Sequence, residues 1–231
     1  MKTRPWIVLS AALVLFGSGP RAAGEPPALS WYQTELRLAS APAYMGSPAP
    51  ITNVHERSHW VSNELTNRYG RGGRDACLYV GNGRFVRIAQ PRPLRIAHVA
   101  DRVRFRGRIF DLYLVQQRDY WDAEPLYLFD EWVCYSNGAA TAVGSYPGYD
   151  NAYTVAQALE FSHYTAVTLD AVPANYDARP LAAFWLWNAA RLEAIAKKAR
   201  LQPGNWEPSA DNWLHEMRRA AVRVRARYPG R

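Results

Sequence analysis

Glycine and proline are sparse in this chain, with 15 and 16 among 231 residues, and no internal repeat is visible. With hydrophobic residues at 48%, this composition excludes a low-complexity or disordered chain. A chain of this length and composition can bury a core. We therefore expect one domain, with room for an appendage.

Cysteine is scarcer still, since the chain has only Cys77 and Cys134. Neither lies near the N-terminus, which argues against a lipoprotein anchored through an N-terminal cysteine. In an oxidising compartment the two can form one disulfide. The alternative is two small buried residues. Both stay open, because the sequence does not give the Cα separation that a disulfide requires.

Long hydrophobic runs are also missing after the N-terminus, where no segment approaches the roughly 20 apolar residues that span a bilayer. Residues 1–24 have the order of a signal peptide, with a basic start, an apolar run over 6–16 and small residues at 22–24. We expect cleavage before Glu25 and export to the periplasm or the medium. The use of 25 Arg against 3 Lys indicates a bacterial source.

Acidic residues are too few to balance the basic ones, and the formal net charge is +8. Without residues 1–24 the chain has 25 basic and 20 acidic residues, and six of the basic ones form a C-terminal cluster. The rest is close to neutral, so we expect no nucleic-acid partner. The cluster favours either contact with an acidic surface or a solvated helix face. It consists of Arg218, Arg219, Arg223, Arg225, Arg227 and Arg231.

The hydrophobic pattern predicts an α+β fold that is mostly α-helical, with a small antiparallel sheet and about five or six helices. An extended segment over 25–50 precedes the main domain over 51–231, whose C-terminal helices occupy 177–231. Thr52 or Asn53 can cap the first helix. The predicted helices cover about 52–68, 94–103, 126–143, 151–172, 180–201 and 210–228, and the predicted strands cover 77–80, 84–89 and 109–116.

The first predicted helix contains His55-Glu56-Arg57-Ser58-His59, which has the spacing HExxH. Four residues make a little over one helical turn, so both imidazoles project from one face and can bind one metal ion. Glu56 can then reach a water at that metal. The alternative is a surface helix with two solvated histidines. The pattern favours a zinc site.

A catalytic zinc ion needs a third protein ligand and an open fourth position. Glu131 lies in the apolar helix over 126–143, where an unpaired carboxylate would be costly, and a metal ion would remove that cost. Tyr127 and Tyr135 flank it at four-residue spacing. The rival ligand is His163, on the apolar stripe of the next helix, although a lone histidine there is more often a core residue.

Two further polar residues have two interpretations each. Asp130 either orients a ligating histidine or is an ordinary helix-surface acid. Asn63, one turn beyond His59, shares its face and either lines the site or bonds to the backbone.

Together these residues resemble zincin metallopeptidases of the gluzincin type, in which HExxH on one helix is completed by a Glu from a later helix. The chain departs from thermolysin-like enzymes in the 72-residue gap from His59 to Glu131 and in lacking an NAxY strand motif. The stretch 54–138 is also similar to a group of exported bacterial proteins of uncharacterised function. That similarity rests on His55-Glu56-x-Ser58-His59-x-Val61 followed by Leu65, Asn67 and Arg68, and on Leu126-Tyr127-x-Phe129-Asp130-Glu131-Trp132-Val133 followed by Tyr135-x-Asn137-Gly138.

The resemblance implies a zincin-like fold, with the sheet beside the first helix, and an exported zinc metallopeptidase that hydrolyses peptides or proteins. Zinc would acidify a water, Glu56 would accept its proton, and another side chain would stabilise the oxyanion. The alternative is a non-catalytic binding or structural protein on the same scaffold, which need not retain Glu56. The candidates for the oxyanion donor are Tyr127, Tyr135, His163 and Tyr164.

Overall fold

The computed structural model describes residues 31–33, 50–81, 84–145, 151–202 and 206–229. The expected signal peptide over 1–24 lies outside the described residues, as does most of 25–50. The described chain is mostly helical with a small antiparallel sheet, which confirms the α+β prediction. Its elements are β1 (Trp31–Gln33), α1 (Pro50–Tyr69), β2 (Asp75–Gly81), β3 (Arg84–Ala89), α2 (Ile96–Ala100), the π-helix η2 (Asp111–Gln116), α3 (Arg118–Trp121), α4 (Tyr127–Ser145), α5 (Asn151–Ala171), α6 (Arg179–Arg200) and α7 (Ser209–Arg227).

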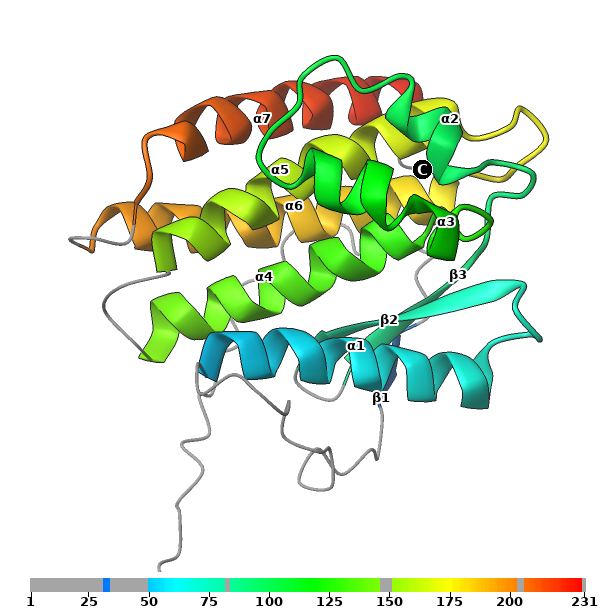
Figure 1. The fold of residues 1–231 in the computed structure, drawn as a ribbon, viewed down its shortest axis with the longest axis horizontal. Coiled ribbons are helices and arrows are strands. Elements are labelled where there is room, and N and C mark those ends of the chain that lie inside the picture. The colour runs from blue at the N-terminus through cyan, green and yellow to red at the C-terminus, as the bar shows by residue number, and fades with distance from the viewer. Residues whose placement is uncertain (1–30, 34–49, 82–83, 146–150, 203–205, 230–231) are drawn as a thin grey trace, which may run out of the picture.

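Helix α1 begins at Pro50, two or three residues before the expected caps. Proline is tolerated there because the backbone N–H groups of a first helical turn have no partner within the helix, so the N–H that proline lacks is not missed. It ends at a glycine-rich turn, in which Gly72 and Gly73 adopt positive φ angles of 57° and 71°. The turn leads directly into β2, which lies along α1 (Figure 1). The expectation that the sheet lies beside the first helix is met.

The sheet has the strand order β1-β3-β2, with both pairs antiparallel. The hairpin predicted around residues 81–83 joins β2 to β3, and Leu78 faces Val86 across it. Strand β1, in the segment predicted only as extended, pairs with β3 through Trp31 and Val86. Strand β2 is therefore an edge strand among the described strands.

Helix α4 packs against α1 and connects the sheet layer to the remaining helices (Figure 1). The two helices run antiparallel, because His59 contacts Asp130 near the start of α4 whereas Ile51, eight residues earlier in α1, lies beside Gly138, eight residues later in α4. Helices α5 and α6 cover the other side of α4, and α7 packs on them. The core lies mainly between these helices, where the fully buried rings of Trp132 and Trp185 are 5.7 Å apart.

The segment 109–116, predicted as a strand, is mostly the π-helix η2, so that prediction is wrong. Ile109 and Phe110 are buried, as are Tyr113 and Leu114, whereas the residues between and after these pairs are exposed. Buried pairs that recur after four residues follow a helical period rather than the two-residue period of a strand. With η2 and the short α3, the described residues contain eight helices instead of five or six.

Cys77 and Cys134 are both buried and free, so in this structure they are two small buried residues and not a disulfide.

Three arginines of the C-terminal cluster form surface ion pairs with acidic residues of α5, α6 and α7. Within the described residues, no helix has the length and apolar content to cross a membrane. The paired arginines are Arg218 with Glu193, Arg219 with Glu216 and Arg227 with Asp170.

Candidate metal centre

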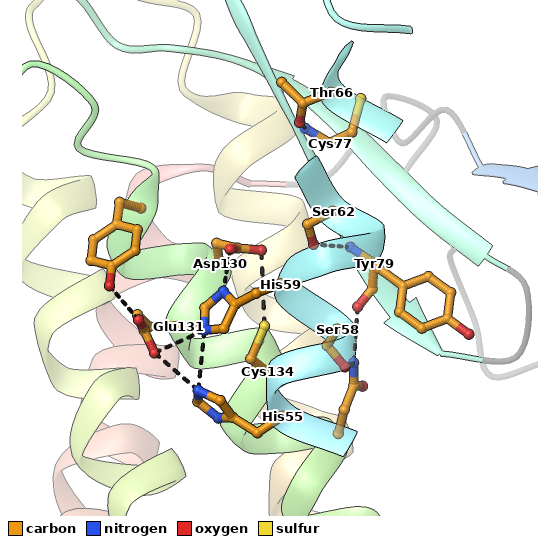
Figure 2. A network of polar contacts seen from close by, with 12 residues as sticks. His55, Ser58, His59, Ser62, Thr66, Cys77, Tyr79, Asp130, Glu131 and Cys134 are labelled. Carbon is orange, nitrogen blue, oxygen red and sulfur yellow. Dashed lines mark hydrogen bonds and ion pairs between the residues drawn. The ribbon is translucent and has the colours of Figure 1, made fainter. Parts of the chain in front are cut away.

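Three side chains from α1 and α4 converge at one point (Figure 2). His55 and His59, four residues apart on α1, present their Nε2 atoms 3.1 Å from each other. The Glu131 Oε2 atom of α4 lies 3.5 Å from His55 Nε2 and 3.3 Å from His59 Nε2. The antiparallel packing of α1 against α4 thus closes the 72-residue gap in sequence. The group can hold a metal ion.

The burial of this group supports such a role. Glu131 is only 3% exposed, and its Oε2 atom has no hydrogen-bond partner among the described residues. A buried carboxylate oxygen without a hydrogen bond is costly unless a cation compensates it. Burial, together with the neighbouring His59, lowers the pKa of His55 to about 3, so this imidazole is neutral and its Nε2 lone pair is available. Glu131 and His55 are therefore suited to ligation.

His163, the rival third ligand, does not belong to this group. It lies on α5, and its ring centroid is 6.3 Å from that of Phe105 and 5.9 Å from that of Trp213. Burial lowers its pKa, as expected for a neutral imidazole among aromatic rings. The structure thus brings Glu131, and not His163, to the two histidines of the HExxH motif.

Asp130 orients one of the histidines. Its Oδ2 atom lies 2.6 Å from His59 Nδ1, which makes Nδ1 the protonated nitrogen and leaves Nε2 free to face Glu131. Burial works against a proton on His59, but the neighbouring Cys134 and Asp130 outweigh it and raise the pKa of this histidine, so a metal ion at Nε2 would have to displace a proton. Asp130 is therefore an orienting residue rather than an ordinary surface acid.

Cys134 lies behind this pair, with its Sγ atom 4.0 Å from Asp130 Oδ1. His59, Asp130 and Cys134 form a second group of closely spaced ligand atoms. However, burial raises the pKa of the Cys134 thiol far above its ordinary value, so the sulfur stays protonated. Since a cysteine ligates as the thiolate, this second group is less suited to a metal than the first.

We expect the substitution Asp130→Asn to weaken metal binding by about 10- to 100-fold, because the neutral amide no longer fixes the His59 tautomer as strongly. Titration of the metal-free protein against a competing chelator measures the affinity. Asp119→Asn, an 87% exposed acid on α3, is the matched control and should not change it. An unchanged affinity in Asp130→Asn would contradict the orienting role.

The two tyrosines that flank Glu131 in sequence also lie beside the centre. Tyr127 donates its hydroxyl to Glu131 Oε1 at 2.5 Å, so it holds the carboxylate from the side opposite to the histidines. Tyr135 packs edge-on against His55, with ring centroids 4.4 Å apart, and its hydroxyl is 3.0 Å from that of Tyr113. Burial raises the pKa of all three phenols, which therefore keep their protons.

The hydroxyl of Tyr164, a third candidate for the oxyanion donor, is bonded away from the three convergent side chains. Its hydroxyl donates to Glu160 Oε1 at 2.5 Å and accepts from the N–H of Gly107 at 3.1 Å. This contact holds the chain before η2 against α5. A Cβ atom at Gly107 would lie 2.3 Å from Glu160 Cδ, so a larger residue there would displace the Glu160 carboxylate.

The centre opens into a cleft of about 850 Å³. Glu56 and Asn63 of α1 line the cleft together with the three ligands. Burial, assisted by the charge of Glu131 and opposed by His59, raises the pKa of Glu56 above its ordinary value. A carboxylate with a raised pKa beside a metal site is suited to accept a proton.

The wall opposite α1 was not predicted from the sequence. It comes from the η2–α3 segment, through Tyr113, Gln117 and Trp121. The only signal was the aromatic content of this segment, and its prediction as a strand concealed which residues share a face.

Comparisons with protein-family models, with curated proteins and with solved structures found no match for this chain.

Proposed function

We propose that the protein is a zinc-dependent metallopeptidase, a hydrolase of peptide bonds. The observation that carries the proposal is the spacing of the three ligand atoms, which are 3.1, 3.3 and 3.5 Å apart. Tetrahedral ligands about 2.0–2.1 Å from a zinc ion are themselves separated by roughly 3.3 Å. Two histidines and one glutamate are also a common ligand set of catalytic zinc.

The number of ligands favours catalysis over a structural role. A structural zinc site is closed by four protein ligands, whereas a catalytic one keeps a position for water and substrate. Only three described side chains form the His55, His59 and Glu131 group, and the group opens into the cleft. When bound, zinc would supply a Lewis acid that acidifies a water and polarises the substrate carbonyl.

The residues around the ligands take the other roles. Glu56 accepts the proton of the attacking water and passes it to the leaving amine. Tyr127 keeps Glu131 in place. Tyr113 and Tyr135 share one hydrogen bond between two hydroxyls, which leaves one of their two O–H groups available to a substrate oxygen, and Tyr113 lines the cleft. This pair is the best placed donor for the developing oxyanion.

The resemblance to gluzincins supports the same proposal, and so does the retention of Glu56, which a purely structural metal site would not need. Within the proposal, the protein is exported and acts in the periplasm or the medium. The second candidate, a non-catalytic binding protein on a zincin-like scaffold, would keep the ligands and have no use for Glu56 as a base.

Metal analysis followed by an activity screen tests the proposal. The chain from residue 25, purified without chelators, should contain about one zinc ion and should cleave members of a broad peptide library. A chelator should remove both the zinc and the activity, and added zinc should restore them. A protein that neither contains zinc nor takes it up would overturn the proposal, whereas zinc without cleavage would favour the binding protein.

A further inference from the structure

The edge strand beside the cleft has little main chain free for a substrate. The N–H groups of Cys77 and Tyr79, which point away from β3, donate to Thr66 Oγ1 at 2.9 Å and to Ser62 Oγ at 3.1 Å (Figure 2). The carbonyl of Tyr79 accepts from Asn137 Nδ2 at 3.0 Å. An extended peptide that added to β2 would have to displace these bonds. A substrate peptide would therefore be recognised mainly by the side chains that line the cleft.

Those side chains carry charge of one sign. The lining includes five acidic residues, but none of the described lining residues is Lys or Arg, although the chain has 28 of them and a formal charge of +8. Arg71 and Arg87 neutralise Asp75 at the far end of the cleft. The other four carboxylates belong to Glu56, Glu124, Asp130 and Glu131. A bound divalent cation would balance two of their four negative charges and leave two in excess.

An aromatic ring lies beside this charge. One face of Trp121 stacks on Tyr127, with ring centroids 4.4 Å apart and planes 9° from parallel. Trp121 is 37% exposed and lines the cleft, so part of the indole is open to a ligand. Glu124 follows one turn later, with its N–H bonded to the Trp121 carbonyl at 2.8 Å. Since Tyr127 also bonds to Glu131, this pair lies next to the metal ligands.

An open indole and a carboxylate three residues later, both lining the same cleft, suit a cationic side chain. A guanidinium or ammonium group gains from the electron-rich face of a tryptophan, and the Glu124 carboxylate adds an ion pair. A negatively charged side chain at the same place would be repelled by the excess charge of the cleft.

We propose that the cleft selects polypeptides with a basic residue, whose arginine or lysine side chain binds at Trp121 and Glu124. The inference rests on the proposed peptidase function for the nature of the substrate, but it concerns binding, which can be measured without turnover. It adds a substrate class and two specificity-determining residues to the zinc centre.

Binding of short peptides to the Glu56→Gln variant, loaded with zinc, tests the inference. The probes are two acetylated and amidated hexapeptides that differ only in one central residue, arginine or the neutral isostere citrulline, and calorimetry at low salt measures their affinities. We expect the arginine peptide to bind about tenfold more tightly, because a stacked cation and an exposed ion pair together contribute roughly this factor. Higher salt should reduce the difference.

Two substitutions should remove the preference and one should keep it. Glu124→Gln and Trp121→Leu should each reduce the arginine-to-citrulline ratio severalfold, whereas Asp119→Asn, an exposed acid on the same segment, should preserve it. Equal binding of the two peptides, no binding of either, or a full preference in Glu124→Gln would overturn the inference.

The test of basic-residue selectivity and the test of peptidase activity can fail independently. If the native protein cleaves peptides without regard to basic residues, the proposed function stands and the selectivity is wrong. If the arginine preference is found but no peptide is cleaved, the selectivity stands and the peptidase does not.

Discussion

Glu56→Gln should lower the turnover of peptide substrates by about 10²- to 10⁴-fold while the zinc content stays the same. The amide has nearly the shape of the carboxylate, but it cannot accept a proton from water. Glu56 lies on the cleft side of α1, next in sequence to a ligand without being one of the three convergent groups. The substitution therefore removes the base and leaves the ligand set intact.

The comparison needs matched zinc content, measured by elemental analysis on the same preparations used for kinetics. Glu64→Gln changes an exposed acid of the same helix and should leave the rate unaltered. His55→Ala should lose both zinc and activity. If Glu56→Gln and the native protein cleave at equal rates, Glu56 is not the base, and the hydrolysis comes from elsewhere.

The geometry of the histidine pair could be predicted from the sequence because it depends only on helical periodicity. His55 and His59 are four residues apart, so any helix through them places both rings on one face. The helix itself follows from the apolar spacing and from the glycines at its end. No long-range information was needed for this half of the centre.

The place of Glu131 beside the two histidines could be predicted from the cost of burial. Glu131 lies within an apolar helix, and a carboxylate is rarely buried there without a partner. Imidazole is far less costly to bury, so His163 could be a core residue, and it lies among aromatic rings. The argument says which residue needs a cation, although it cannot say how α4 approaches α1.

The rest of the site depends on packing that the sequence does not display. Segment 109–116 is almost wholly apolar, so its pattern could not separate a strand from a helix, and the wall around Tyr113 was missed. Tyr164 is one of the four candidates for the oxyanion donor, but its partner at Gly107 is 57 residues away in sequence. By contrast, Ser62 and Thr66, four residues apart on one helix face, are a readable signal for the contact with β2.

Removal of zinc should lower the melting temperature of the protein by about 8–16 °C. At a free zinc concentration near one thousand times the dissociation constant, binding stabilises the folded state by about 4 kcal/mol. For a chain of this size each kcal/mol shifts the melting temperature by roughly 2–4 °C. Calorimetric scans of the same preparation with zinc and with a chelator give the difference directly.

Substitutions at the candidate ligands show which residues are needed for the zinc-dependent rise in melting temperature. Glu131→Ala should abolish most of it, because one of three ligands is lost, whereas His163→Ala should retain it in full. Each substitution also alters the metal-free protein, since both side chains are at least partly buried, so only the zinc-dependent increment is compared. An increment that survives in Glu131→Ala but disappears in His163→Ala would mean that α5, and not α4, supplies the third ligand. That result would contradict the convergence of His55, His59 and Glu131.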